Sequence, residues 1–139
     1  MNPQKLYRRH ASHNWTRADM LLAIYDEAER SLETADQLLV EGDLIGLIQA
    51  QLRCVRLILL LLEGIDPDQG EVAHNIHRLC VYVIDVLATD SPDRFQKALD
   101  VIRPLKAGFT SARAEANELE ANGHIPRLNF DSGANVAFA

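Results

Sequence analysis

Residues 43–64, DLIGLIQAQLRCVRLILLLLEG, decide the fold, because they predict one long helix with apolar side chains on two of its faces. One apolar row steps by three and four residues, as neighbours on one side of a helix do. Its members are Ile45, Ile48, Leu52, Val55, Leu59 and Leu62. A second row beside it consists of Leu47, Ala50, Cys54, Leu57 and Leu61. One row is enough to pack a helix into a small bundle, so the second row needs a functional explanation.

The helix before this segment is predicted to begin at Thr16 and to have one apolar side and one polar side. Thr16 is placed to accept a hydrogen bond from the amide of Asp19, as N-cap residues do. The apolar residues repeat at heptad spacing; they are Leu21, Tyr25, Ala28, Leu32, Ala35 and Leu39. Gly42 is expected to end the helix in the left-handed cap conformation, and Asp43 is placed to cap the next helix.

Two further helices follow after short joints. A turn over residues 65–70, in which Pro67 forces an extended residue before it, leads into a third helix over residues 71–88. That helix also carries two apolar rows, Val72, Ile76, Leu79, Val83 and Val86 on one side and Ala73, Cys80, Ile84 and Leu87 on the other. Ser91 and Pro92 open the fourth helix. It is expected to kink at Pro104 rather than stop there.

Short joints make neighbouring helices antiparallel, so the predicted fold is an all-α, antiparallel up-and-down four-helix bundle. The bundle is assigned to residues 16–123, after an irregular N-terminal arm (1–15) and before a C-terminal tail (124–139). A chain of 139 residues fits one domain with a sizeable core of its own. The tail holds more large apolar residues than a solvated tail needs, namely Ile125, Leu128, Phe130, Val136 and Phe138.

Charge and cysteine content exclude several classes of protein. The net charge of −6 disfavours a nucleic-acid partner, and the one basic cluster, Lys5, Arg8, Arg9 and Arg17, is interpreted as a solvated arm. Both cysteines lie on apolar helical rows, where cysteine acts as a small hydrophobe. The N-terminus has no hydrophobic signal segment, and the longest apolar run, residues 57–62, is far shorter than a membrane span. We therefore expect a cytoplasmic protein without a membrane partner.

Motifs for catalysis or cofactor binding do not emerge from the sequence. It has neither a glycine-rich phosphate loop nor a nucleophile elbow. His74 and His77 could share a metal ion, but no third ligand accompanies them, so a polar patch at a helix start is the preferred interpretation. A phosphotransfer domain would have a lysine three residues after its histidine, whereas Cys80 follows His77 at that spacing. We expect no enzyme activity, no metal and no cofactor.

The surplus apolar rows predict a surface that binds a partner. Its expected residues are Leu47, Cys54, Leu57 and Leu61 together with Cys80, Ile84 and Leu87, and these should be more exposed than Leu52, Val55 and Leu59. A long apolar groove suits an amphipathic helical segment. A wide core that covers both rows and a homodimer interface are the alternatives.

Several features taken in order resemble the flagellin export chaperone family, FliS. They are Tyr7 nine residues ahead of Thr16, Tyr25-Asp26 in the first helix, Gln49-Ala50-Gln51 in the second, and Tyr82 and Leu87 in the third. The resemblance covers residues 7–116. Arg17 stands where the family usually has proline and Glu27 where it usually has glycine, which points to a divergent member with an adapted partner.

The resemblance implies a chaperone that binds the disordered C-terminal segment of flagellin, prevents premature polymerisation and serves flagellar type III secretion. Tyr82, which matches a tyrosine of the family, and Ala50, from the second row of the long helix, complete the expected partner surface. Tyr7 lies on the arm ahead of the first capped helix, and its amphipathic ring is predicted to act as a lid on the groove. Further implied partners are the flagellar export apparatus or regulatory proteins. The tail is expected to occupy apolar surface when no partner is bound, against the alternative of a disordered end. A homodimeric adaptor or a phosphotransfer-type module without its usual motif is the alternative function.

Overall fold

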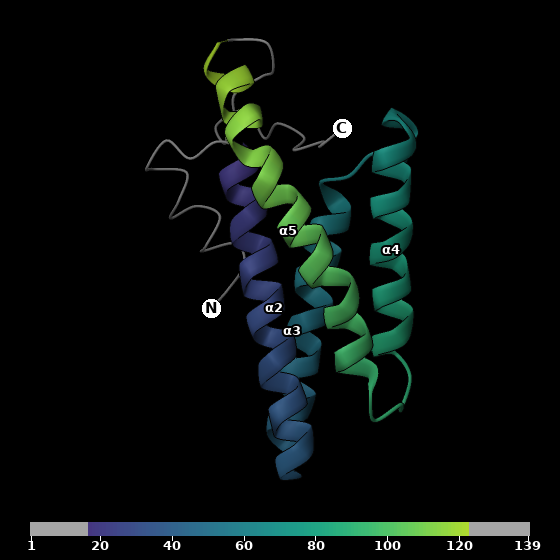
Figure 1. The fold of residues 1–139 in the computed structure, drawn as a ribbon. Coiled ribbons are helices and arrows are strands. Elements are labelled where there is room, and N and C mark those ends of the chain that lie inside the picture. The colour runs from purple at the N-terminus through teal and green to yellow at the C-terminus, as the bar shows by residue number, and fades with distance from the viewer. Residues whose placement is uncertain (1–16, 123–139) are drawn as a thin grey trace.

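The computed structural model of the chain describes residues 17–122, except for the side chains of residues 113–117, 119 and 120. Its elements are α2 (Arg17–Glu41), α3 (Leu44–Glu63), the short 3-10 helix η1 (Pro67–Gln69), α4 (Glu71–Leu87) and α5 (Arg94–Ala121). Figure 1 shows that consecutive helices run in opposite directions and that α5 returns to the side of α2. Residues 17–122 contain no strand, and the predicted all-α four-helix bundle is confirmed. Thr16, the arm and the tail lie outside the described residues.

The joint between α2 and α3 forms as its residues predict. Gly42 has a φ of 77°, the left-handed conformation that favours glycine. The Asp43 carboxylate accepts a hydrogen bond from the Gly46 amide at 3.0 Å and so caps α3. Because residues of the joint itself end α2 and cap α3, the two helices form a tight antiparallel hairpin.

The other two joints are also local structures. Asp66 accepts a hydrogen bond from the amide of Asp68 at 3.0 Å, which fixes the turn that contains Pro67. Before α5, the Ser91 hydroxyl donates to the carboxylate of Asp93, and the helix begins at Arg94, two residues later than Pro92. The helix then continues through Pro104, as predicted.

The core lies between all four helices and is built mainly from aliphatic side chains, with two aromatic rings and two cysteines. Its members are Leu21, Ile24, Tyr25, Ala28, Leu32 and Ala35 on α2, Leu47, Cys54, Leu57, Ile58 and Leu61 on α3, Cys80, Val83 and Leu87 on α4, and Phe95, Ala98, Leu99 and Ile102 on α5. The heptad row predicted for α2 is therefore confirmed, with Leu39 only partly buried at its end.

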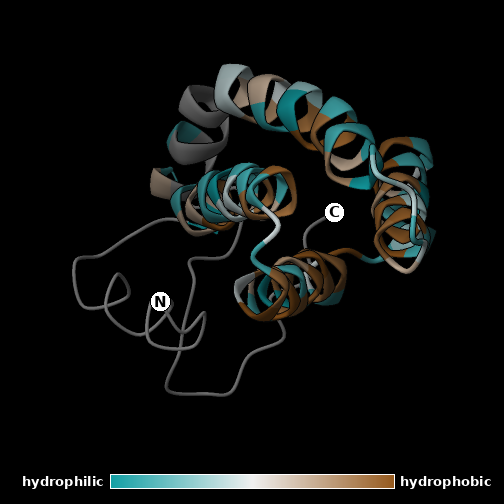
Figure 2. Cartoon of the chain, turned by 90° about the horizontal axis from the view of Figure 1, so that it is seen from below, coloured by the Kyte–Doolittle hydropathy of each residue, from teal (hydrophilic) through white to brown (hydrophobic). Residues whose placement is uncertain are grey.

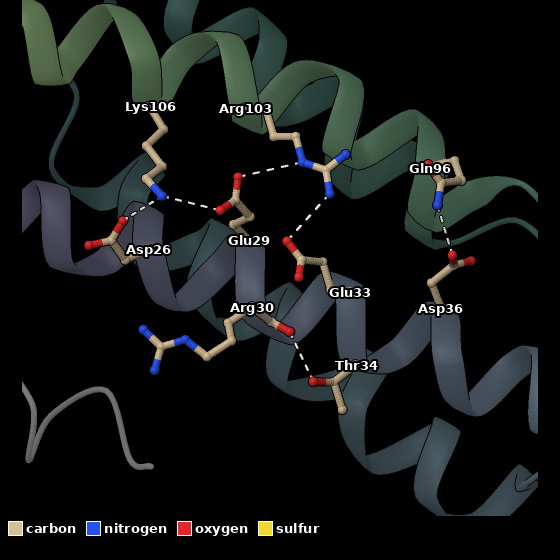
Figure 3. A network of polar contacts seen from close by, with 9 residues as sticks. All are labelled: Asp26, Glu29, Arg30, Glu33, Thr34, Asp36, Gln96, Arg103 and Lys106. Atoms are coloured by element: carbon tan, nitrogen blue, oxygen red, sulfur yellow. Dashed lines mark hydrogen bonds and ion pairs between the residues drawn. The ribbon is translucent and has the colours of Figure 1, made fainter.

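The outer seam between α2 and α5 is closed by charged side chains (Figure 3). The Lys106 ammonium lies 2.8 Å from Asp26 and 3.1 Å from Glu29, and Arg103 lies 3.5 Å from Glu29 and 3.3 Å from Glu33. Hydrogen bonds to Asp26 and then Glu29 raise the pKa of Lys106. These contacts give α2 and α5 a polar outer side, so the partner surface has to be sought on the other two helices.

Candidate functional site

The exposure predicted for the two rows of α3 is wrong, because the structure reverses it. The row assigned to a partner is buried in the core: Leu47 is 6% exposed, and Cys54, Leu57 and Leu61 are less exposed still. In the row assigned to the core, Ile48 is 68% exposed, Leu52 50% and Leu59 45%. The surplus apolar surface exists, but it is formed by the other face of the helix.

The prediction for α4 fails in part for the same reason. Cys80 and Leu87 are buried in the core, and Ile84 is only partly buried beside it. Tyr82 is 45% exposed, and Ala50 on α3 is partly buried. Tyr7 lies outside the described residues. Of the predicted partner residues that the structure describes, Tyr82 alone is exposed.

Two polar side chains set the rotation of α3 about its own axis. Arg53 donates to Glu27 at 2.7 Å and to Ser31 at 3.2 Å, so this side of the helix faces α2. Gln51 donates to the backbone carbonyl of Leu87 at the end of α4. Buried polar groups need such partners, since leaving one unpaired costs about 1–3 kcal/mol. On the circumference of α3, the side between Arg53 and Gln51 therefore points into the core. Leu47, Cys54 and Leu61 lie on that side.

A signal in the sequence could have identified the outer face. Residues four apart share one side of a helix. Each of three exposed apolar residues stands four residues ahead of a polar one: Ile45 before Gln49, Leu52 before Arg56, and Leu59 before Glu63. The apolar residues of this row thus share their face with the polar residues of α3, which is where water lies.

We call the resulting surface the α3 row; it consists of Leu44, Ile45, Ile48, Leu52 and Leu59, with the partly buried Val55 and Leu62 at its inner edge. Val55 and Leu59 follow Gln51 by four and eight residues, so the row lies on the side of α3 toward α4. Figure 2 shows hydrophobic colour over much of α3 and α4. Val81 and Tyr82 are further exposed apolar side chains, on α4. A row of large apolar side chains left in water on one helix face is typical of a binding surface.

α3 is also long and apolar enough to cross a membrane by length and composition, and 28% of its apolar stretch is buried inside the fold. Core helices of soluble proteins satisfy the same criterion. The helix contains Arg53 and Arg56 near its middle, and Arg53 is held by Glu27 of α2. Its other face forms part of the core of the bundle, so the structure uses α3 as a packed helix with one open side.

A second apolar feature, the end pocket, lies where the turn between α3 and α4 meets α2 and α5. It holds about 420 Å³ of space, including the part open to solvent. Its lining residues are Leu21, Tyr25, Leu61, Ile65, Val72, Ala73, Ile76 and Phe109. The ring centroids of Tyr25 and Phe109 lie 5.7 Å apart, and burial raises the pKa of the Tyr25 phenol. An apolar lining with one protonated phenol suits hydrophobic binding.

The titratable groups of the core are unsuited to nucleophilic chemistry. Burial raises the pKa of Cys54 to about 12 and that of Cys80 to about 11, whereas a reactive cysteine needs a lowered pKa. Within residues 17–122, no three histidine, cysteine or acidic side chains come close enough to hold a metal ion.

The fold and the α3 row together define an all-α helical bundle whose open face is apolar. The family model described as Flagellar protein FliS matches residues 1–116. The chain belongs to this family, and as a member it is a flagellar export chaperone. The family consists of chaperones rather than enzymes. Comparison with curated proteins and with solved structures gave no match.

Proposed function

We propose that the chain is a cytoplasmic chaperone for flagellin, and that it holds the C-terminal segment of flagellin until secretion through the flagellar type III export apparatus. Family membership supports a flagellar export role in general. The observation that carries the narrower proposal is the α3 row, an apolar surface on a helix whose opposite face is already packed in the core. A chaperone of an assembly-prone segment needs such a surface.

The α3 row fits a partner that becomes helical on binding. Residues 44–62 extend over about 27 Å of helix, which a partner helix of similar length could follow with apolar residues every three and four positions. Such coupled folding buries roughly 1,000–3,000 Å² and spends several kcal/mol on ordering the partner. A complex of this kind is specific and can still be released at the export apparatus.

The edges of the row supply polar contacts. Gln49, Arg56 and Glu63 lie beside it on the outer face of α3, and Tyr82 presents an aromatic ring with a hydroxyl from α4. An amphipathic segment would place its apolar side on the row and its polar side toward these residues and water. Tyr82 and Ala50 remain proposed partner residues, and Tyr7, which the structure does not describe, remains the predicted lid.

Isothermal titration of the full chain with a purified flagellin C-terminal segment tests the proposal. We expect saturable binding, a negative heat-capacity change from apolar burial, and a gain in helical circular dichroism. An N-terminal flagellin segment of equal length is the control. Absence of binding by the C-terminal segment would contradict the proposal. Light scattering of the free chain tests the alternative, because a stable homodimer that the segment does not dissociate would assign the row to self-association.

A further inference from the structure

We propose that the end pocket is the binding site for the chain's own C-terminal tail, and that residues 124–130, HIPRLNF, are the bound segment. This inference does not depend on flagellin being the partner. It concerns a part of the chain that follows the residues matched by the FliS family, 1–116. Four features support it: the chemistry of the pocket, its position, the reach of the tail, and the charge at the rim.

The pocket has the chemistry of a binding site for apolar side chains. Its lining consists of aliphatic and aromatic residues, and about 60 Å³ of its space is sheltered, which is room for an apolar side chain rather than for a whole small molecule. Val72 stands at the start of α4 and is 73% exposed, so an apolar side chain entering there would cover it. Ile65 and Ile76 are partly buried and add aliphatic surface.

The tail leaves the bundle at the same end as the pocket. Figure 1 shows the end of α5 at the end of the molecule where α3 leads into α4, and Phe109 of α5 lines the pocket. Ala121, the last residue of α5, follows Phe109 by 12 residues, which is about 18 Å along the helix. Nine further residues lead to Phe130, and an extended chain of that length spans about 30 Å. The segment is therefore long enough to return to the pocket.

The rim of the pocket and the segment carry opposite charge. Asp66, Asp68 and Glu71 lie in the turn that brings Ile65 and Val72 to the pocket, and Asp68 and Glu71 are exposed. Residues 124–130 contain Arg127 and no acidic residue, with Ile125, Leu128 and Phe130 as apolar side chains. Residues 131–139 begin with Asp131 and contain no basic residue. Charge complementarity therefore favours the first half of the tail over the second.

Amide hydrogen exchange and nuclear magnetic resonance of the full chain test the inference, because each half of the tail controls for the other. Ser replacements at Ile125, Leu128 and Phe130 should shift the amide resonances of Ile65, Ala73 and Ile76. Ser replacements at Val136 and Phe138 should leave them in place. In the unmodified chain, residues 125–130 should exchange about tenfold more slowly than residues 134–139, as partial occupancy of a native contact predicts.

Replacement of two valines, one at the pocket and one far from it, tests the role of the pocket rather than that of the tail. Val72→Gln places a polar side chain at the mouth, whereas Val40→Gln makes the same change at a residue that is 77% exposed on the far end of α2. The first should abolish the slow exchange of residues 125–130 and the second should preserve it. Tail replacements that shift the α3 row instead of the pocket, or equal exchange along the tail, would overturn the inference. So would protection that rises with protein concentration, since a second copy would then supply the tail.

Discussion

At the scale of single residues, the most exacting contact is the one between Gln51 and Arg94. Arg94 is only 8% exposed, and its guanidinium donates to the Gln51 side-chain oxygen at 3.1 and 3.2 Å and to the Ser91 carbonyl at 2.9 Å. Gln51 in turn donates to the carbonyl of Leu87. One amide side chain thus joins α3, α4 and α5, which makes it a structural residue within the Gln49-Ala50-Gln51 element.

Gln51→Ala should destabilise the protein by about 1–3 kcal/mol, because it leaves buried donors of Arg94 without their acceptor. Gln49→Ala is the matched control, since Gln49 is exposed on the same helix and should change stability by less than about 0.5 kcal/mol. Urea denaturation should show a lower midpoint for the first variant with an unchanged slope. Equal, small effects would mean that the buried network contributes little.

The buried thiols predict how stability depends on pH. Burial raises the pKa of Cys54 to about 12 and of Cys80 to about 11, from an ordinary value of 9.0. Above that ordinary value the unfolded chain releases thiol protons that the folded chain keeps, so the free energy of unfolding falls as pH rises. The contribution is complete below about pH 9 and is lost through about pH 11–12.

We therefore expect the urea midpoint to drop between about pH 9 and about pH 11. The raised pKa of Lys106 acts in the same direction, because the folded state holds that proton more tightly too. The double variant Cys54→Ala and Cys80→Ala should show a smaller drop than the parent chain. A drop of the same size in both proteins would assign the pH dependence to Lys106 and Tyr25 rather than to the thiols.

At the scale of elements, the sequence predicts where the helices lie along the chain, but it does not fix which face of α3 points into the core. Helix ends depend on neighbouring residues such as Gly42 and Asp43, so their signals are local and could be predicted. The rotation of α3 depends on partners of Gln51 and Arg53 that lie in other helices. The hydrophobicity of the two rows is too similar to show which of them is buried. The polar residues that follow the α3 row by four positions are the local signal that distinguishes the rows.

Two leucines on α3 test the rotation directly. Leu57 is buried in the core and Leu59 is 45% exposed, although the same residue type stands two positions away. Leu57→Ala should destabilise the protein by about 2–5 kcal/mol, because the lost methyl groups leave a cavity. Leu59→Ala should cost less than about 1 kcal/mol, since much of its surface is already in water. Urea denaturation of both variants measures these losses of stability. A larger loss for Leu59→Ala than for Leu57→Ala would contradict the observed rotation of α3 and support the one predicted from sequence.

At the scale of the whole molecule, the bundle has a polar side and an apolar side. Lys106 and Arg103 join α5 to acidic residues of α2 across one seam, while the α3 row stays open on the other side. The presence of surplus apolar surface could be predicted, because two helices carry more apolar residues than one packing face uses. Its location does not follow from hydrophobicity alone, because the two rows of α3 are similarly apolar and only one of them can face the core.

The affinity of the full chain for the flagellin C-terminal segment, measured by titration calorimetry with variants of the α3 row, tests the central claim. Ile48→Glu with Leu52→Glu should weaken binding at least about 100-fold, because two apolar anchors contribute about 1.5–3 kcal/mol each. Ala107→Glu adds the same kind of charge at an exposed position on α5 and should leave the affinity unchanged. Unchanged affinity in the row variant, or an equal loss in Ala107→Glu, would contradict the assignment of the α3 row as the flagellin-binding surface.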